Sequence, residues 1–294
     1  MTAKRACVAM SGGVDSSVAA VLLQREGYEV IGLTMQLYDR GAARSWGRCC
    51  APEDVVDARA VAEGLDIPFY VVNYEDRFRE QVVDYFVTEY AEGRTPIPCI
   101  PCNDRLKFAD LLDRARALGA DFLATGHYAR VESGDGGARL LKGRDPRKDQ
   151  SYFLYGVDRR ALAGVRFPVG DLLKEEVRAI AREAGLPVAD KADSHEVCFV
   201  SAEGAGAFVE RELGGARAGS IVGTSGEVLG EHEGVFHYTI GQRRGLGVPS
   251  SDRLYVTEID APSGRIVVGD RAALRRGGLE VDEVSWHDWP AGAG

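Results

Sequence analysis

The stretch Ser-Gly-Gly-Val-Asp-Ser-Ser, residues 11–17, directly follows an apolar run and has the residue types of a phosphate-binding turn. Its two glycines permit a sharp turn and a close approach of the backbone to a ligand. A helix that begins near Val14 presents unpaired amides and the positive end of its dipole to an anion. Asp15 could orient a bound group or help to hold Mg²⁺ beside phosphates. The chain has no Gly-Lys pair, and this turn lacks Gly-x-Gly-x-x-Gly, which excludes a Walker A loop and a Rossmann fingerprint.

Six cysteines are the second set of residues that could do chemistry. Cys7 lies inside the apolar run and is predicted to be a core residue. Cys102 and Cys198 stand among polar residues and prolines, which favours a reactive role, because a reactive thiolate needs a partly open, electropositive setting. Arg105 and Lys107 could provide that setting for Cys102.

The elements that must position these residues alternate between strands and helices through the first half of the chain. Such alternation predicts βαβ units, and hence an α/β fold with a parallel sheet and helices on both faces. Gly126 follows the fourth strand, at the edge where open α/β sheets have their ligand crevices. The predicted strands are Lys4–Met10, Tyr28–Tyr38, Pro68–Asn73 and Asp121–Thr125, and the predicted helices are Val14–Glu26, Pro52–Gly64, Glu75–Ala91 and Asp104–Leu118.

The second half of the chain changes character. An amphipathic helix is predicted at Leu173–Ala184, and the Gly/Ala-rich stretch Ala202–Ala218 is predicted to be a junction. From residue 219 onward, short β-rich runs separated by turns predict a smaller, mainly β domain at residues 201–270, after a first domain at 1–200. The predicted strands of the second half are Arg139–Gly143, Ser220–Val222, Glu227–Leu229, Val235–Thr239, Leu254–Ile259 and Arg265–Val268.

Charge and composition limit the cellular setting. The net charge of −9 argues against indiscriminate binding to nucleic acid, although a local basic surface remains compatible with it. No stretch of eighteen apolar residues predicts a transmembrane helix, and the first residues lack the features of a secretory signal. We therefore expect a cytoplasmic protein without a membrane partner, in which cysteines stay mostly reduced.

The motifs resemble known families at two levels. Residues 11–17 after a first strand resemble the pyrophosphate-binding loop of the adenine nucleotide α-hydrolase-like ATP pyrophosphatases, which cleave ATP between its α and β phosphates to adenylate a substrate oxygen. Arg94–Phe108 (RTPIPCIPCNDRLKF) and Asp193–Val200 (DSHEVCFV) are similar to signatures of the tRNA-specific 2-thiouridylases, which place sulfur at C2 of the wobble uridine. Further matches, in the family's order, are Gly32–Met35, Ala124–Ala129, Lys148–Phe153 and Tyr238–Gly247.

This resemblance implies ATP and Mg²⁺ as cofactors, tRNA as substrate, and a persulfide donor protein as partner, with no dedicated metal site. It implies that Cys198 carries the persulfide and that Cys102 is the nucleophile, with Asp15 as a further catalytic residue. The two cysteines would release sulfur by forming a transient disulfide, which requires their Cα atoms to approach within about 7 Å. The residues implied in ATP binding are Ala9, Met10, Ser11, Gly12, Gly13, Val14, Asp15, Ser16, Ser17, Met35 and Gly126.

A basic stretch with aromatic residues supports the implied tRNA contacts. Residues 139–166 contain eight Arg or Lys against three Asp, with Tyr152, Phe153 and Tyr155 interleaved. This composition suits an anticodon loop whose bases splay and stack, and the chemistry requires the target base to be flipped into a pocket. The residues implied to contact tRNA are Ile97, Pro98, Cys99, His127, Lys148, Asp149 and Gln150.

Three alternatives also fit the sequence. Cys99, Cys102 and Cys198 could hold an iron–sulfur cluster with one open site, as in cluster-dependent tRNA thiolases, and the roles of Cys49 and Cys50 are not assigned. Another ATP pyrophosphatase, such as an amidotransferase-type synthetase with a small-molecule acceptor, would not need two thiols. A non-catalytic remnant would bind tRNA or nucleotide only.

The chain also departs from the family pattern at three places. Ile97 stands where relatives commonly carry Asn, and His195 stands where Gln is common. Residues 271–294 are expected to be the start of an incomplete C-terminal β domain, which would weaken the grip on tRNA more than the chemistry.

Overall fold

A computed structural model describes residues 4–37, 52–134, 137–193, 197–200, 203–282 and 284–286. Cys49, Cys50, His195 and residues 287–294 lie outside this described part of the chain. The chain divides into two compact units. The first unit comprises Met1–Gln81, Cys99–Phe199 and Ser285–Gly294, and the second comprises Val82–Pro98 and Val200–Val284.

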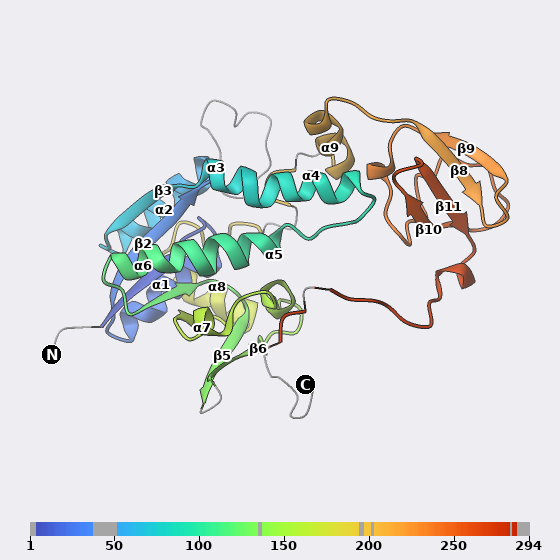
Figure 1. The fold of residues 1–294 in the computed structure, drawn as a ribbon. Coiled ribbons are helices and arrows are strands. Elements are labelled where there is room, and N and C mark those ends of the chain that lie inside the picture. The colour runs from blue at the N-terminus through green and yellow to red at the C-terminus, as the bar shows by residue number, and fades with distance from the viewer. Residues whose placement is uncertain are drawn as a thin grey trace. The chain divides into compact units, whose positions relative to one another are not determined.

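The first unit is built on a five-stranded parallel sheet with strand order β3-β2-β1-β4-β7 (Figure 1). Every neighbouring pair in this sheet is parallel, which confirms the fold predicted from the alternation of strands and helices. Parallel strands place all their carboxyl ends at one edge, so the loops after β1, β2 and β4 meet there. The strands are β1 (Arg5–Ala9), β2 (Glu29–Gln36), β3 (Phe69–Asn73), β4 (Phe122–Thr125) and β7 (Val165–Arg166).

Helices cover both faces of this sheet. Ala6 and Val8 of β1 share one buried core with α1 (Val14–Arg25), α2 (Pro52–Gly64) and α8 (Lys174–Glu183). Cys7 lies between them and points to the opposite face, as the two-residue period of a strand requires. That face carries the continuous helical run of α5 (Cys99–Pro101), the π-helical segment Cys102–Leu111 and α6 (Leu112–Ala117) (Figure 1). The unit also contains α3 (Glu75–Phe78) and α7 (Arg159–Leu162), and the π-helical turn Arg79–Val83 crosses from the first unit into the second after Gln81.

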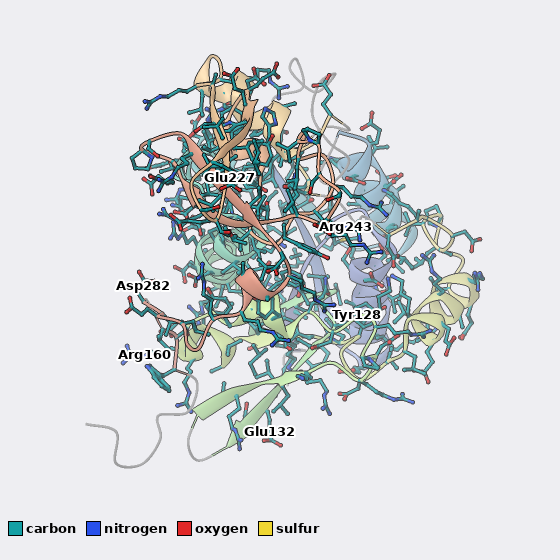
Figure 2. All side chains as sticks on the ribbon, turned by 90° about the vertical axis from the view of Figure 1, so that its right-hand side faces the viewer. Tyr128, Glu132, Arg160, Glu227, Arg243 and Asp282 are labelled. Carbon is teal, nitrogen blue, oxygen red and sulfur yellow. The ribbon has the colours of Figure 1, made fainter. Side chains whose placement is uncertain are left out.

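A β-hairpin extends the first unit beyond the sheet. Strands β5 (Ala129–Gly134) and β6 (Gly137–Lys142) pair antiparallel, and Glu132 lies on this hairpin (Figure 2). The sequence predicts a strand only at the second of these positions. A short 3₁₀ turn at Ser151–Leu154 follows it.

The second unit contains a four-stranded sheet with strand order β10-β11-β8-β9, which confirms the predicted smaller β domain. Ile221, Val256 and Ile266 form the centre of its core and are fully buried. Its elements are α4 (Asp84–Ala91), α9 (Ala205–Leu213), β8 (Gly219–Gly223), β9 (Val228–His232), β10 (Tyr255–Asp260), β11 (Arg265–Gly269) and 3₁₀ turns at Val235–His237 and Ala272–Leu274.

One strand prediction for this unit is wrong. The predicted strand at 235–239 contains a 3₁₀ turn, Val235–His237, instead. The Tyr238 amide donates to the Val235 carbonyl at 3.0 Å, and such a bond between residues three apart closes a turn and does not occur in an extended strand. The predicted junction at 202–218 contains α9, whose Phe208 packs edge-on against Phe86 of α4 with ring centroids 6.1 Å apart. The small residues around Phe208 conceal the helical period. In the described part of the chain, no helix is both long and apolar enough to cross a membrane.

Candidate active site

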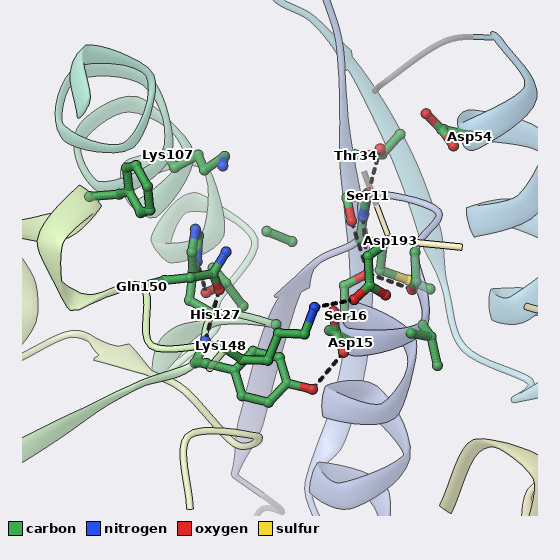
Figure 3. Close-up of a pocket in the computed structure, with 18 of the residues that line it drawn as sticks. Ser11, Asp15, Ser16, Thr34, Asp54, Lys107, His127, Lys148, Gln150 and Asp193 are labelled. Atoms are coloured by element: carbon green, nitrogen blue, oxygen red, sulfur yellow. Dashed lines mark hydrogen bonds and ion pairs between the residues drawn. The ribbon is translucent and has the colours of Figure 1, made fainter. Parts of the chain in front are cut away.

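A cavity of about 480 Å³ opens where β1, β2 and β4 end, and it lies entirely within the first unit (Figure 3). A volume of this size suits a nucleotide-sized ligand. The cavity therefore brings together much of the predicted ATP site and part of the predicted tRNA site. Predicted residues that line it are Ala9, Met10, Ser11, Gly13, Val14, Asp15, Ser16, Met35, Gly126, His127, Lys148, Asp149 and Gln150.

The loop before α1 is held by its own serines. Ser17 Oγ donates to the carbonyl of Gly13 at 2.8 Å, Ser16 Oγ donates to the same carbonyl at 3.2 Å, and the Ser11 amide donates to Ser16 Oγ at 3.2 Å. Gly13 is the N-cap residue of α1 and offers no side-chain cap to its first amides. The described loop is therefore pre-shaped while its helix-end amides can bind an anion.

Gly126 allows this loop to pack against the end of β4. A Cβ atom added at Gly126 would lie 2.4 Å from the backbone nitrogen of Ser16 and 2.6 Å from the backbone carbon of Asp15. No side chain fits at such distances, so glycine is required for the close approach of the two backbones. Gly126 thus shapes the cavity wall from beneath the first turn of α1.

Asp15 is held by two residues that sequence reasoning missed. Lys174 Nζ, at the start of α8, donates to both carboxylate oxygens of Asp15 at 2.7 and 2.8 Å. The Tyr128 hydroxyl donates to Asp15 Oδ1 at 2.8 Å. Burial, the charge of Asp15 and this hydrogen bond raise the pKa of Tyr128, so its hydroxyl stays protonated as a donor.

Asp193 is a second carboxylate that lines the cavity with Asp15, and it forms ion pairs with three cationic side chains. Lys148 Nζ lies 2.6 Å from Asp193 Oδ2, while Lys174 Nζ and Arg178 Nη2 lie 2.8 and 3.0 Å from Oδ1. Burial alone would raise the pKa of Asp193, but the hydrogen bonds from Lys148 and Lys174 outweigh it and lower the pKa to about 2. Asp193 is therefore ionised throughout the physiological range.

Lys191 connects the same segment to the loop. Its ammonium donates to the Gly12 carbonyl at 3.0 Å and to Asp54 and Asp57 of α2, each at 2.6 Å. Burial opposes the charged form, yet these two carboxylates raise the pKa of Lys191. The loop, α2 and the chain leading toward Cys198 therefore meet at one ammonium group.

His127 stands in the cavity wall across from the loop (Figure 3). Its Nδ1 lies 2.7 Å from Thr125 Oγ1, and its ring packs beside those of Phe108 and Phe167. Burial and, to a lesser degree, the Lys107 ammonium lower the pKa of His127 well below its usual value. His127 is thus a neutral hydrogen-bonding group.

We expect His127 to make the protein less stable in mild acid. The unfolded imidazole takes up a proton near pH 6.5 whereas the folded one does not, so stability is complete above about pH 6.5 and falls as the pH drops below that value. The free energy of unfolding in urea, measured at pH 7.5 and 5.5, should fall more in wild type than in His127→Gln. Equal losses, or an NMR titration of His127 near pH 6.5, would contradict this.

The predicted Lys148–Gln150 segment separates into different roles. The Asp149 carboxylate accepts from the amides of Gly143 and Ser151 and from the Ser151 hydroxyl, so it stabilises the turn. Gln150 lines the cavity, and its Oε1 accepts from the Tyr128 amide at 2.9 Å. All three residues line the cavity, where Lys148 and Gln150 carry donor groups and Asp149 carries an acceptor that the turn already uses.

The two predicted reactive cysteines lie outside the cavity lining. Cys102 begins the π-helical segment and is 8% exposed, and Cys198 is partly exposed. Asn103 beside Cys102 donates to the carbonyl of Phe153, a cavity residue, at 3.0 Å. Phe199 beside Cys198 packs edge-on against Phe78, with ring centroids 5.6 Å apart. Each cysteine is therefore anchored by its neighbour within the first unit.

Other predicted site residues also lie off the cavity lining. Gly12 faces Lys191 through its carbonyl, and Ser17 is fully buried beneath the loop. Ile97 and Pro98 belong to the second unit, whereas the exposed Cys99 belongs to the first. Among the residues that the structure describes, no three His, Cys, Asp or Glu side chains are arranged to hold a metal ion.

A parallel sheet that ends in this serine- and glycine-lined loop defines an ATP-binding α/β protein of the adenine nucleotide α-hydrolase type. The family model described as "tRNA methyl transferase HUP domain" matches residues 4–202, and "tRNA methyl transferase PRC-barrel domain" matches residues 206–270. The chain belongs to the tRNA-specific 2-thiouridylase family, as its sequence motifs predict.

Three relatives show how far this similarity extends. The tRNA-specific 2-thiouridylase MnmA of Hyphomonas neptunium is 54% identical over 285 residues, which cover 96% of this chain and 72% of the relative. The MnmA proteins of Methylorubrum populi and Geobacter metallireducens are 54% and 51% identical, again over 96% of this chain and over 74% and 79% of their own lengths.

A solved structure titled "Crystal structure of a 4-thiouridine synthetase - RNA complex with bound ATP" is a more distant likeness. The two chains are 15% identical, the matched region covers 64% of this chain and 43% of the other, and the TM-score is 0.40.

Proposed function

We propose that this tRNA 2-thiouridylase uses ATP to adenylate the C2 oxygen of the wobble uridine and then replaces that oxygen with sulfur from a persulfide on Cys198. The observation that carries the proposal is the single cavity shared by the phosphate loop and by His127, Lys148 and Gln150. A nucleotide and a flipped base could meet there.

The ATP side of the cavity is assigned from its shape and its donors. The uncapped amides at the start of α1 suit the phosphates, while Met35 at the end of β2 lines the wall available to the adenine. Lys191 places a positive charge beside Gly12. ATP so placed would present its α phosphate to a base held across the cavity.

Mg²⁺ is proposed as the companion of ATP rather than as a resident ion. Magnesium is usually held by one or two carboxylates together with substrate phosphates. Asp15 fits this role, because among the described residues its Oδ2 accepts only from Lys174 and retains acceptor capacity at the cavity wall. When bound, the ion would neutralise charge on the phosphates, and Asp15 would hold it beside the loop.

The tRNA side is assigned to neutral and basic donors. His127 stays neutral, so it can hydrogen-bond a base without adding charge. Lys148 supplies a cation, and Gln150 supplies an amide with one side already bound to Tyr128. Such a wall suits an uncharged uracil edge next to an RNA phosphate.

The sulfur step follows from the two thiols. ATP and the C2 oxygen form an O-adenylate with release of pyrophosphate, and the terminal sulfur of the Cys198 persulfide attacks C2 and displaces AMP. The Cys102 thiolate then attacks Cys198 Sγ and forms a disulfide, which leaves the electron pair and the sulfur on the uridine. A thiol reductant returns the enzyme to its starting state, and a donor protein with a persulfide recharges Cys198.

The proposal is tested by thiolation of an unmodified tRNA transcript. Purified protein, ATP, Mg²⁺, a cysteine desulfurase and cysteine should yield 2-thiouridine at the wobble position, measured by mass spectrometry, with one AMP formed per thiolated tRNA. A transcript with cytidine at that position is the matched control and should gain no sulfur. Thiolation at another position, or of a small acceptor instead of tRNA, would refute it.

A further inference from the structure

The ionic contacts beneath the cavity form one continuous chain. It runs from Asp15 in the phosphate loop through Lys174 to Asp193. It continues from Asp193 to Lys148, and Figure 3 shows this last contact. The three distances along it are 2.7, 2.8 and 2.6 Å. Asp15, Asp193 and Lys148 line the cavity, whereas Lys174 lies behind its wall.

Lys174 is fully committed to this chain. An ammonium group has three donors, and Lys174 directs them at both oxygens of Asp15 and at Asp193 Oδ1. The residue is 8% exposed, so water competes little with these contacts. Its backbone amide donates to Asp145, which fixes the start of α8 in place. Lys174 has no donor left for a substrate and is a positioning residue.

Asp193 is the point where the chain can redistribute charge. It shares its negative charge among Lys174, Lys148 and Arg178. An RNA phosphate that draws Lys148 away would leave Asp193 with two cations, and Asp193 would then hold Lys174 more strongly. Asp15 would lose part of its hold on Lys174 and become more available to a cation that accompanies the ATP phosphates.

We propose that Lys174 and Asp193 couple the binding of tRNA to the binding of ATP, so that each substrate tightens the other through the chain Asp15–Lys174–Asp193–Lys148. The inference rests on the proposed function, because it takes Lys148 as a tRNA contact and Asp15 as a group on the ATP side. Such coupling would delay ATP cleavage until tRNA is in place. Linkage requires that the same factor apply in both directions.

The coupling is measured as the dissociation constant of an ATP analogue without tRNA divided by its dissociation constant with tRNA bound. A non-cleavable α,β-methylene ATP analogue with Mg²⁺ is titrated into wild type with and without unmodified tRNA. We expect tRNA to tighten binding of the analogue about tenfold, within the usual range of such couplings. In Lys174→Met both ligands should still bind, but the ratio should fall below about two, while Lys174→Arg should restore most of it.

Two further variants separate this role from a structural one. Lys148→Met cuts the chain at its more exposed end, so it should abolish the coupling even if Lys174→Met folds poorly, as thermal unfolding would reveal. Arg178→Met is the matched control. Arg178 also contacts Asp193, but its other bonds go to the carbonyls of Ala189 and Lys191, so this variant should keep the wild-type ratio.

The outcomes distinguish this inference from the proposed function. If wild type binds both ligands with a ratio of one, or if Lys148→Met keeps the full ratio, the coupling chain is refuted and the proposed function stands. If Arg178→Met loses the ratio as completely as Lys148→Met, the effect belongs to Asp193 packing and the chain is again refuted. Failure of wild type to bind tRNA or the analogue refutes the proposed function and the inference together.

Discussion

Cys198→Ser should abolish 2-thiouridine formation, with a loss of about three orders of magnitude or more, because serine cannot carry a persulfide. The phosphate loop does not use this thiol, so the variant should still release pyrophosphate when tRNA and ATP are both present. Nucleoside mass spectrometry measures the first quantity, and single-turnover pyrophosphate release measures the second. Loss of both would place Cys198 in ATP activation and contradict its assignment as the sulfur carrier.

Cys102→Ser should fail at a different step. Without the Cys102 thiolate, the disulfide between Cys198 and the sulfur on C2 persists, so tRNA should stay covalently attached to the protein until a reductant is added. Denaturing gels with and without dithiothreitol detect this adduct. A Cys102→Ser variant that neither thiolates tRNA nor traps it would remove the disulfide step from the mechanism.

Cys99→Ser is the control that separates the persulfide mechanism from a cluster mechanism. Cys99 is exposed at the start of α5, three residues before Cys102. The persulfide mechanism gives its thiol no step, so Cys99→Ser should retain most sulfur transfer under strict exclusion of air. A loss as large as that of Cys198→Ser, together with iron and sulfide bound to wild type, would favour the three-cysteine iron–sulfur site.

The phosphate loop was predictable from sequence because its physics is local. A buried strand, two glycines and a helix start occupy consecutive positions, and the hydroxyls of Ser16 and Ser17 bond within four residues of themselves. Gly126 was predictable for a related reason, since it directly follows a strand. Nothing distant in the chain is needed to recognise either feature.

The ionic chain behind the loop was not predictable in the same way. Lys174 is 159 residues from Asp15 in sequence, and Tyr128 is 113 residues from it. Lys174 begins an amphipathic helix, where a lysine is normally taken for a solvated residue. Its contact with Asp15 exists because α8 and α1 pack in one core. Only the assembled sheet brings these groups together.

The sequence also does not show to which of the two units each helix between residues 75 and 91 belongs. Periodicity predicts one helix over residues 75–91, yet α3 counts with the first unit and α4 with the second. The π-helical turn Arg79–Val83 separates them. A period of apolar residues reports that a face is buried, but it does not report which core buries it. The packing of Phe86 on Phe208 supplies that information.

Gly12→Ala should destroy ATP binding through a backbone collision. Gly12 has φ of +72°, and a Cβ atom there would lie 2.2 Å from the Asp54 carbonyl oxygen and 2.7 Å from the Asp54 Cα. Both are backbone atoms of α2, so no side-chain rotation relieves the contact, and the left-handed conformation adds about 1 kcal/mol of strain for alanine. The loop must therefore leave its position, and the Gly12 carbonyl must leave Lys191.

The expected loss of affinity for the ATP analogue is at least about a hundredfold, with a loss of about 1–3 kcal/mol in stability from overpacking. Gly64→Ala is the matched control, because a Cβ atom at Gly64 meets nothing within 4 Å. Calorimetric titration and urea unfolding of both variants measure the two effects. If Gly12→Ala bound the analogue within threefold of wild type, the loop would be deformable and the pre-shaped phosphate site would be wrong. If Gly12→Ala lost affinity for the analogue without losing stability, the loop alone would have moved. The backbone of α2 would then not be the cause of the collision's cost in stability.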